Sequence, residues 1–451
     1  ARIKYGHDYA SNRTWREDVI AENDSVDLDE LYTYDGLDRL ATVERGEING
    51  TYTTISSDTF GQTWDLDQLN NWDNFTEDDD GNGTDDLDQD RTHNDVNEIT
   101  AITATTGANW VDPTHDAAGN TITGPTPGDE TATQKYTYDA WNRMTKVTDG
   151  SDTTIGEYAY DGRNYRITKA IHDAGTLTHT DHFYYNENWQ ALEVRREISG
   201  TEDPDPREQY VWHPDYIDSL AVRYFDADTD GNLAENSDGP HYYTQGANYH
   251  VLAITDDSGT VLERYHYDPY GRLSVRDADF TTDADGASDI DNPYTFTGRR
   301  LDEESGLYSF RNRYYDMVSG RFTSRDPLDY EDGGSLYSAY LVPSNVDPSG
   351  LRSINDILDD AELRNGHGPW GFSAAHCWAA CYFGAVFGAG NLAAGIADIG
   401  EIIAPSNDSW RDIRAQHHGA ALGNVFAWWD LCGDPGSTPE DYCDAACNTW
   451  P

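Results

Sequence analysis

The chain has 451 residues, which is enough for two or three domains with cores of their own. Only 37% of the residues are hydrophobic, but 12% are aromatic and 30 are tyrosines, a composition that excludes an acidic disordered chain. The formal net charge of −53 at pH 7 excludes nucleic acid as a partner of so acidic a scaffold, because the phosphates would be repelled.

Degenerate repeats occupy the first part of the chain. The clearest copies read Tyr-x-Tyr-Asp, then a turn, and stand at 32–40, 136–144, 158–167 and 265–273. Alternation places both tyrosine rings on one face of a strand, and Asp with a nearby Gly or Asn forms the turn that follows. An isolated hairpin is only marginally stable, so we expect the copies to stack side by side in a mainly β fold.

Three acidic inserts interrupt this pattern, at 78–86, 226–231 and 283–291. Each spaces carboxylates around a glycine, and oxygen ligands in that arrangement can wrap a hard cation such as Ca²⁺. The alternative is a set of solvated acidic loops without an ion, and the sequence leaves both interpretations open. The candidate calcium ligands are Asp78, Asp80, Asp85, Asp226, Asp228, Asp230, Asp283, Asp285 and Asp289.

The tract 292–351 contains two Asp-Pro elements and ends in Asp-Pro-Ser-Gly-Leu at 347–351. Together with the repeats it resembles the YD-repeat (RHS) family and the RHS-associated core that follows such repeats. The motifs that carry the likeness are Tyr-Asp-Pro-Tyr-Gly-Arg (267–272), Phe-Thr-Gly-Arg (296–299), Gly-Leu-Tyr (306–308), Arg-Tyr-Tyr-Asp (313–316) and Gly-Arg-Phe (320–322).

The resemblance implies a three-part organisation. Residues 1–275 would form a sheet of β-hairpins that spirals into a partial shell, and 276–351 would be the associated core that plugs it. Residues 352–451 would be a variable cargo domain. The recognisable hairpins are too few to close a shell, so we expect further N-terminal repeats of a longer chain as partners of these.

The resemblance also implies an aspartic self-cleavage site. Two neighbouring carboxyls can share one proton, so that one activates water while the other polarises the scissile carbonyl. The family pattern gives these tasks to Asp326 and Asp347 and places the cut at Leu351–Arg352, with Arg325 expected to hold one carboxylate ionised. The alternative is that both Asp-Pro elements are simply turns. The spacer before Asp347 is shorter than the family form, which puts the pairing in question.

Residues 352–451 lack the repeat signature and are predicted to form a small, mainly α domain. The apolar segment 377–397 has the length of a membrane span, and burial inside the domain is the other interpretation. Two pairs of cysteines are spaced to share a helical face, and disulfides, free thiols and a metal site all stay open for them. The candidate disulfide residues are Cys377, Cys381, Cys443 and Cys447.

These features favour a secreted or cell-surface scaffold that encloses or presents a toxin-like C-terminal effector and releases it by self-cleavage. The expected partners are its own C-terminal domain, a target-cell surface and an immunity protein, and the one expected cofactor is Ca²⁺. The alternative is a structural or adhesive surface protein with calcium-binding loops and no released cargo. The sequence names no reaction for the cargo, so enzymatic activity beyond the aspartic site stays open.

Overall fold

The computed structural model describes residues 2–227, 231, 233, 239–330, 334–339, 343 and 346–351. These residues belong to one compact unit, Ala1–Leu351. The helical cargo domain, the membrane-length segment and the cysteine pairs predicted within 352–451 lie outside the described residues, as do Asp228 and Asp230. Among the residues that are described, no helix combines the length and the apolar character that crossing a membrane requires.

The first sheet contains eight strands in sequential order, each antiparallel to its neighbour along the chain. A short helix, α1 (Val19–Asn23), follows its second strand and begins at Asp18, whose side chain accepts hydrogen bonds from the first turn. The strands are β1 (Ile3–His7), β2 (Arg13–Asp18), β3 (Asp29–Tyr34), β4 (Leu40–Ile48), β5 (Ile55–Leu66), β6 (Trp72–Asp78), β7 (Leu87–His93) and β8 (Ile99–Thr106).

The second sheet contains fifteen strands and is also sequential and open, with β9 and β23 at its two edges. Its strands are β9 (Thr114–His115), β10 (Thr121–Thr126), β11 (Asp129–Tyr138), β12 (Met144–Asp149), β13 (Thr154–Tyr160), β14 (Arg166–Asp173), β15 (Thr176–Tyr185), β16 (Ala191–Ile198), β17 (Thr201–Glu202), β18 (Glu208–Trp212), β19 (Leu220–Phe225), β20 (His241–Gln245), β21 (Val251–Thr255), β22 (Val261–Tyr267) and β23 (Leu273–Asp277). The prediction of a mainly β fold built from consecutive hairpins is confirmed.

The Tyr-Asp turns explain why the chain reverses where it does. Between β3 and β4, Asp35 Oδ1 accepts hydrogen bonds from the backbone N–H groups of Leu37 (2.8 Å) and Arg39 (3.0 Å). The Arg39 side chain donates from Nε to Oδ2 of the same aspartate at 2.8 Å. Asp139 and Asp161 cap their own turns in the same way. Each aspartate therefore fixes its hairpin turn by contacts within the turn itself, which do not depend on packing between hairpins.

Tyrosine builds much of the buried face of these sheets, as the repeat pattern predicts. The first tyrosine of each clear repeat is only 3–5% exposed, while the second is less deeply buried in most copies. Each ring buries a large apolar area and keeps a hydroxyl that needs a hydrogen-bond partner. These first tyrosines are Tyr32, Tyr136, Tyr158 and Tyr265.

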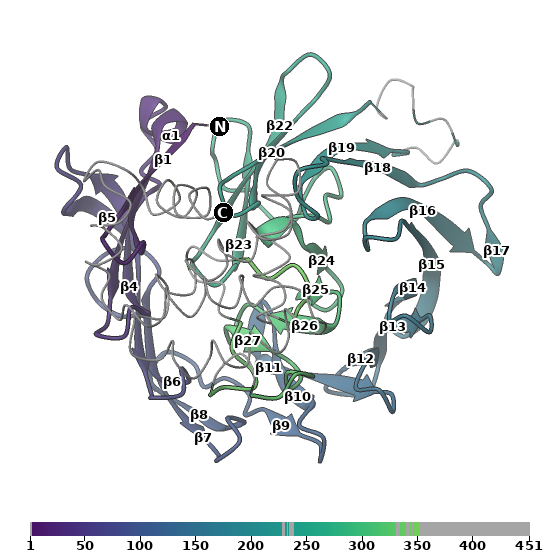
Figure 1. Ribbon diagram of the computed structural model, residues 1–451, viewed down its shortest axis with the longest axis horizontal. Helices are drawn as coiled ribbons and strands as arrows, with labels where there is room; N and C mark the ends of the chain where they lie inside the picture. Colours follow the sequence, from purple (N-terminus) through teal and green to yellow (C-terminus); the bar gives the residue numbers. More distant parts are fainter. Residues whose placement is uncertain are drawn as a thin grey trace, which may run out of the picture. The chain divides into compact units, whose positions relative to one another are not determined.

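The tract after the repeats forms a small third sheet, which Figure 1 shows in green, with the two large sheets curving around it. The sheet consists of the strands β24 (Arg300–Asp302), β25 (Leu307–Phe310), β26 (Arg313–Asp316) and β27 (Arg321–Phe322), and the 3₁₀ turn η1 (Phe296–Gly298) precedes it. Tyr315 donates its hydroxyl to the carbonyl of Tyr270 at 2.8 Å. Arg321 Nη1 donates to the carbonyl of Asn97 at 2.8 Å. The core sheet therefore contacts segments of both large sheets.

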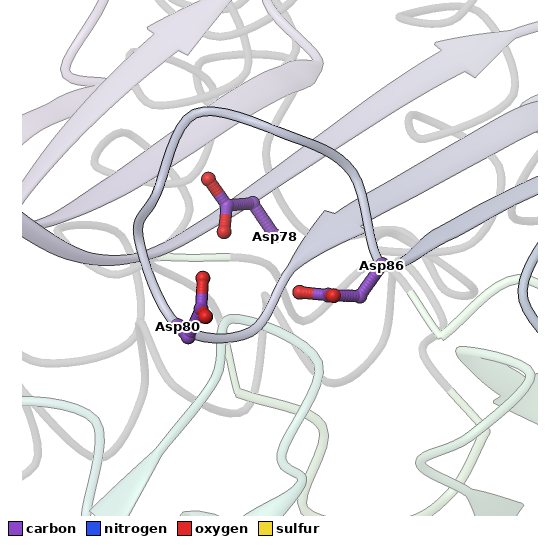
Figure 2. Close-up of side chains that lie close together, drawn as sticks. All are labelled: Asp78, Asp80 and Asp86. Atoms are coloured by element: carbon purple, nitrogen blue, oxygen red, sulfur yellow. The ribbon is translucent and has the colours of Figure 1, made fainter.

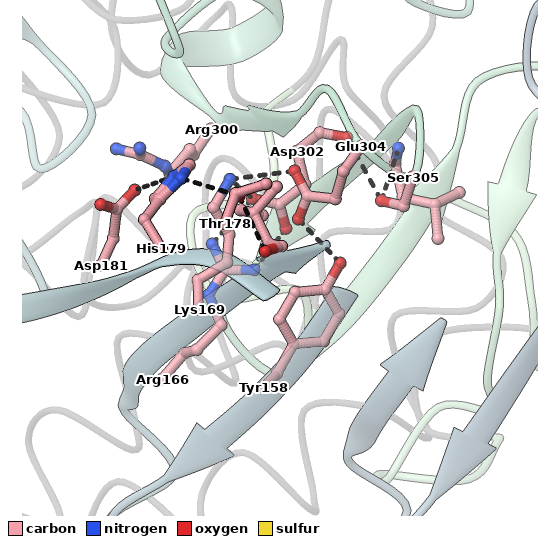
Figure 3. Close-up of polar contacts among 12 residues, drawn as sticks. Tyr158, Arg166, Lys169, Thr178, His179, Asp181, Arg300, Asp302, Glu304 and Ser305 are labelled. Carbon is pink, nitrogen blue, oxygen red and sulfur yellow. Dashed lines mark hydrogen bonds and ion pairs between the residues drawn. The ribbon is translucent and has the colours of Figure 1, made fainter. Parts of the chain in front are cut away.

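A buried cluster of charges also joins the core to the second sheet (Figure 3). Asp302, the fully buried last residue of β24, forms a two-pronged ion pair with Arg166 of β14, and one of the two contacts measures 2.9 Å. Lys169 lies 3.5 Å from Asp302 and 3.0 Å from Glu304. The hydroxyl of Tyr158 donates to Glu304 at 2.9 Å. Two carboxylates of the core are thus neutralised by two cations of the second sheet.

We expect the described unit to lose stability in mild acid because of His250, which stacks on Phe296 of the core with ring centroids 4.5 Å apart. Its Nδ1 accepts a hydrogen bond from Thr297 N–H at 2.9 Å, so the ring is neutral. Burial, with the charges of Arg13 and Arg16, lowers the pKa of His250 to about 3. The unfolded histidine titrates near 6.5, so the free energy of unfolding falls by up to about 1.4 kcal/mol for each pH unit below 6.5.

Urea unfolding between pH 7.5 and 5.0 measures this effect. His250→Asn keeps an acceptor for Thr297 but does not titrate, so its stability should depend less on pH than that of the unsubstituted chain. His213→Asn, the same substitution at a histidine whose side chain is 52% exposed, is the variant with which His250→Asn is compared. Equal slopes for His250→Asn and the unsubstituted chain would contradict the role of His250.

Candidate active site

The structure brings Asp326 and Asp347 to one guanidinium group. Arg313, the first residue of β26, has Nη2 2.8 Å from Oδ2 of Asp326 and 4.0 Å from Oδ2 of Asp347. The two aspartates are 7% and 2% exposed, and the Arg313 side chain is 1% exposed. The short spacer therefore does not prevent the two carboxyls from facing the same arginine. Their catalytic role stays a prediction.

Arg325 does not have the position that the sequence suggested. Its Nη2 lies 2.5 Å from Glu98 Oε1, and its Nε donates to the hydroxyl of Tyr337 at 3.3 Å. Arg325 and Asp326 are consecutive in a segment without regular secondary structure, and their side chains have different partners. The arginine that pairs with Asp326 is Arg313, so the expectation for Arg325 is corrected. Arg313 stands in the Arg-Tyr-Tyr-Asp motif, but no local spacing linked it to either aspartate.

The surroundings of Asp326 favour its protonated form. Burial raises the pKa of Asp326 above its usual value, and the nearby charge of Asp347 raises it further. Arg313 and a 2.8 Å hydrogen bond from the Leu328 N–H to Oδ1 act in the opposite direction but do not cancel the rise. A carboxyl whose pKa is raised beside a second carboxyl is the arrangement that acid–base chemistry requires.

Asp347 also closes a turn, as the alternative interpretation predicts. Its Oδ1 accepts hydrogen bonds from the backbone N–H groups of Ser349 (3.2 Å) and Gly350 (2.8 Å). Gly350 has φ +69°, and a Cβ there would lie 2.2 Å from the carbonyl oxygen of Phe310. The turn therefore requires glycine for both conformation and space. Turn formation and catalysis are not exclusive, because the Oδ2 atom of Asp347 faces Arg313.

Four side chains hold four successive backbone carbonyls of this turn. Arg299 Nη2 donates to the Asp347 carbonyl at 2.6 Å, and Asn312 Nδ2 donates to the Ser349 carbonyl at 3.0 Å. Arg311 binds the carbonyl between them and Arg313 binds the one that follows. We call these four residues the carbonyl clamp. The clamp holds the backbone carbonyls of residues 347–350, and its arginines also contact carboxylate side chains.

The clamp is itself anchored by a buried carboxylate in the second sheet. Asp218, 2% exposed, accepts from Arg299 at 3.1 Å and from Arg311 at 2.6 Å. Asp218 lies in the turn before β19, far from the core in sequence, so neither its position nor its partners follow from the repeat pattern. Through Asp218 and the carbonyl clamp, the second sheet thus helps to orient the backbone of residues 347–350.

The acidic inserts give two groups of carboxylates close enough to share a cation. Asp78 and Asp80 group with Asp86 rather than with Asp85 (Figure 2). The oxygens of each group lie within 4.8 Å of one another. Asp86 directly precedes β7, and its N–H donates to the Glu77 carbonyl at 2.8 Å, which places its side chain over the loop. Calcium binding by this loop stays a prediction.

The other two inserts depart further from the expected ligand sets. Asp283 and Asp289 group with Asp277 at the end of β23, whereas Asp285 uses Oδ1 to accept from the N–H of Ala287 at 2.9 Å. Asp226 is 5% exposed and accepts from the N–H of Gly231 at 3.1 Å, while its two predicted companions lie outside the described residues. Local alternation of carboxylates did not predict which of them converge.

Comparison with known proteins agrees with this fold. No family model matches the chain. It is 32% identical over 148 residues to the tRNA3(Ser)-specific nuclease WapA of Bacillus spizizenii, covering 31% of this chain and 6% of that protein. It is 26% identical over 170 residues to the double-stranded DNA deaminase toxin A of Burkholderia cenocepacia, covering 36% and 11%. The chain spans less than half of the length of the curated relatives it matches.

A solved structure shares the architecture over most of the chain. The crystal structure of TcdB2-TccC3-Cdc42 superposes with a TM-score of 0.56 over 80% of this chain and 17% of that chain, at 19% sequence identity. The likeness shows the fold alone, which in this chain consists of large antiparallel sheets. The sequence relatives include a nuclease and a toxin, in keeping with the resemblance to the YD-repeat proteins.

Proposed function

We propose that residues 1–351 are the wall and the self-processing core of a toxin-delivery protein. The core cuts the Leu351–Arg352 bond and frees the segment that follows. The observation that carries this proposal is the convergence of Asp326 and Asp347 on Arg313, beside a backbone held at four successive carbonyls. A fixed backbone next to a carboxyl pair provides the proximity that peptide hydrolysis needs.

The chemistry uses one protonated and one ionised carboxyl. The ionised carboxylate takes a proton from water as the water oxygen bonds to the Leu351 carbonyl carbon, and the protonated carboxyl gives its proton to the carbonyl oxygen. In the second step the bond from this carbon to the Arg352 nitrogen breaks. The nitrogen takes the proton that the first carboxyl had received from water, and one hydroxyl on the tetrahedral carbon returns its proton to the second carboxyl. The products are a Leu351 carboxylate and an Arg352 amine. The raised pKa of Asp326 favours Asp326 as the protonated member of the pair.

The sequence relatives support a carrier role for the wall. Their printed activities, on a tRNA and on double-stranded DNA, differ from one another, while the part that each shares with this chain is a small fraction of its length. We infer that the shared part is a common carrier and that 352–451 is the effector of this chain. A secreted or cell-surface location, a target-cell surface and an immunity protein as partners belong to the same proposal.

Intact-mass spectrometry of the purified chain in denaturant tests the self-cleavage. We expect two masses, which correspond to residues 1–351 and 352–451, and no remaining full-length mass after folding is complete. The measurement identifies the cut bond directly. A chain that stays whole after it has folded would count against the proposed function.

The two carboxylate groups favour a second candidate, a structural or adhesive surface protein stiffened by Ca²⁺. Bound cations would also screen the self-repulsion of so acidic a chain. Melting the same preparation with calcium and with a chelator separates the candidates. A rise in melting temperature with calcium that Asp78→Asn and Asp80→Asn remove, in a chain that remains uncut, supports the second candidate. A split chain with no response to calcium supports the first.

A further inference from the structure

Ser349 places its hydroxyl between the Asp347 carboxylate and the carbonyl at which the chain would be cut. Its Oγ donates to the carbonyl oxygen of Leu351 at 2.8 Å and lies 3.3 Å from Asp347 Oδ1. The same Oγ accepts a hydrogen bond from the Leu351 N–H at 3.0 Å. A hydroxyl has one proton to donate, and the contact to Leu351 is shorter than the contact to Asp347.

We propose that Ser349 is a catalytic residue of the self-processing reaction, whose hydroxyl stabilises the charge that develops on the Leu351 carbonyl oxygen. The inference rests on the proposed function, because it concerns the same bond. As water adds to the carbonyl carbon, the oxygen gains electron density before it receives its proton. A hydrogen bond to that oxygen is stronger in the transition state than in the uncut chain, which is the condition for a catalytic effect.

The carbonyl clamp makes this contact persist. The carbonyls of residues 347–350 are all held by side chains of the clamp, whereas the contact to the Leu351 carbonyl comes from within the turn itself. Asp347 also accepts from the N–H of Ser349, so the serine backbone is fixed as well. A donor that needs no rearrangement to reach the reacting oxygen is preorganised for catalysis. The residue between Pro and Gly in Asp-Pro-x-Gly-Leu then sets the rate of cutting.

A purely structural role for Ser349 is the competing explanation, because its Oγ also accepts from the Leu351 N–H and could simply shape the turn. Ser305 offers a matched control in the same core. Its Oγ donates to the Asp302 carbonyl, three residues before it, at 3.2 Å and accepts from the Leu307 N–H, two residues after it, at 3.4 Å. Ser305 thus also makes one donated and one accepted hydrogen bond to local backbone, away from the carboxyl pair. Ser305 contacts none of the atoms that react.

The test follows the full chain after cell-free synthesis and measures the half-time of its conversion to the two fragments. We expect Ser349→Ala to lengthen this half-time about 100-fold, the usual effect of removing one such donor. Ser349→Thr keeps a hydroxyl and should cut within a few-fold of the unsubstituted rate, and Ser305→Ala should cut at the unsubstituted rate. An unsubstituted chain that never splits overturns the proposed function. A chain that splits equally fast with Ser349→Ala overturns the role of Ser349 alone.

A second measurement distinguishes chemistry from misfolding. In the uncut background of Asp326→Asn, the chain can be labelled with ¹³C at leucine carbonyls and ¹⁵N at arginine. Leucine precedes arginine only at 351–352 and 363–364, so the Leu351 carbonyl gives one of two signals. Ser349→Ala should shift this carbonyl resonance upfield, since the hydrogen bond is lost, while the melting temperature of the chain stays within a few degrees. An unshifted resonance would show that the hydroxyl does not bind this oxygen.

Discussion

The chain with Asp326→Asn should remain a single polypeptide of full mass after folding, whereas the unsubstituted chain splits at Leu351–Arg352. Asparagine has almost the shape of aspartate and can still accept a hydrogen bond from Arg313, but it can neither hold nor transfer the proton. The loss of one acid–base group lowers a rate by about 100- to 10,000-fold. Cutting should then take longer than the time over which a preparation is normally handled. The uncut fraction by intact mass is the measured quantity.

The control for this substitution is Asp329→Asn. Asp329 is exposed, lies three residues further along the chain and has a positive φ of 58°, which asparagine tolerates as well as aspartate. It should cut at the unsubstituted rate. Asp347→Asn should resemble Asp326→Asn, because both carboxyls are needed. Efficient cutting by Asp326→Asn or by Asp347→Asn would show that the carboxyl pair is not needed for the reaction.

Removal of the Asp302 carboxylate should destabilise the described unit by about 3–5 kcal/mol, the usual cost of leaving buried cations without their partner. Asp302 is fully buried, and the side chains of Arg166 and Lys169 are 5% and 9% exposed. In Asp302→Ala, Lys169 still has Glu304, but Arg166 loses both of its contacts with a carboxylate. Denaturant unfolding of the uncut Asp326→Asn background, with and without Asp302→Ala, gives the difference directly.

An exposed ion pair provides the comparison for this effect. Lys135 lies 2.7 Å from Asp152, and their side chains are 32% and 78% exposed. Asp152→Ala should change the free energy of unfolding by less than about 1 kcal/mol, because water solvates both charges when the pair is lost. If Asp302→Ala were as mild as Asp152→Ala, the buried cluster would not be holding the core sheet to the wall.

Much of the fold could be predicted because its signals are local. The alternation of Tyr-x-Tyr places both rings on one face of a strand, and the Asp that follows caps its own turn through backbone atoms two and four residues away. Strands that are joined by such turns pair in sequential order, as both large sheets do. The pairing of Asp326 with Asp347 came from the family resemblance rather than from spacing.

The sequence alone determined the strand pattern, the turns and the pair of Asp-Pro elements, because each depends on residues within a few positions of one another. Only the tertiary structure decided which charges meet. In the structure Asp326 pairs with Arg313 and not with Arg325. In the loop at 78–86, Asp86 and not Asp85 lies close to Asp78 and Asp80. The physical reason is that an ion pair or a ligand group depends on where distant segments cross, and many sequences with the same local pattern cross differently.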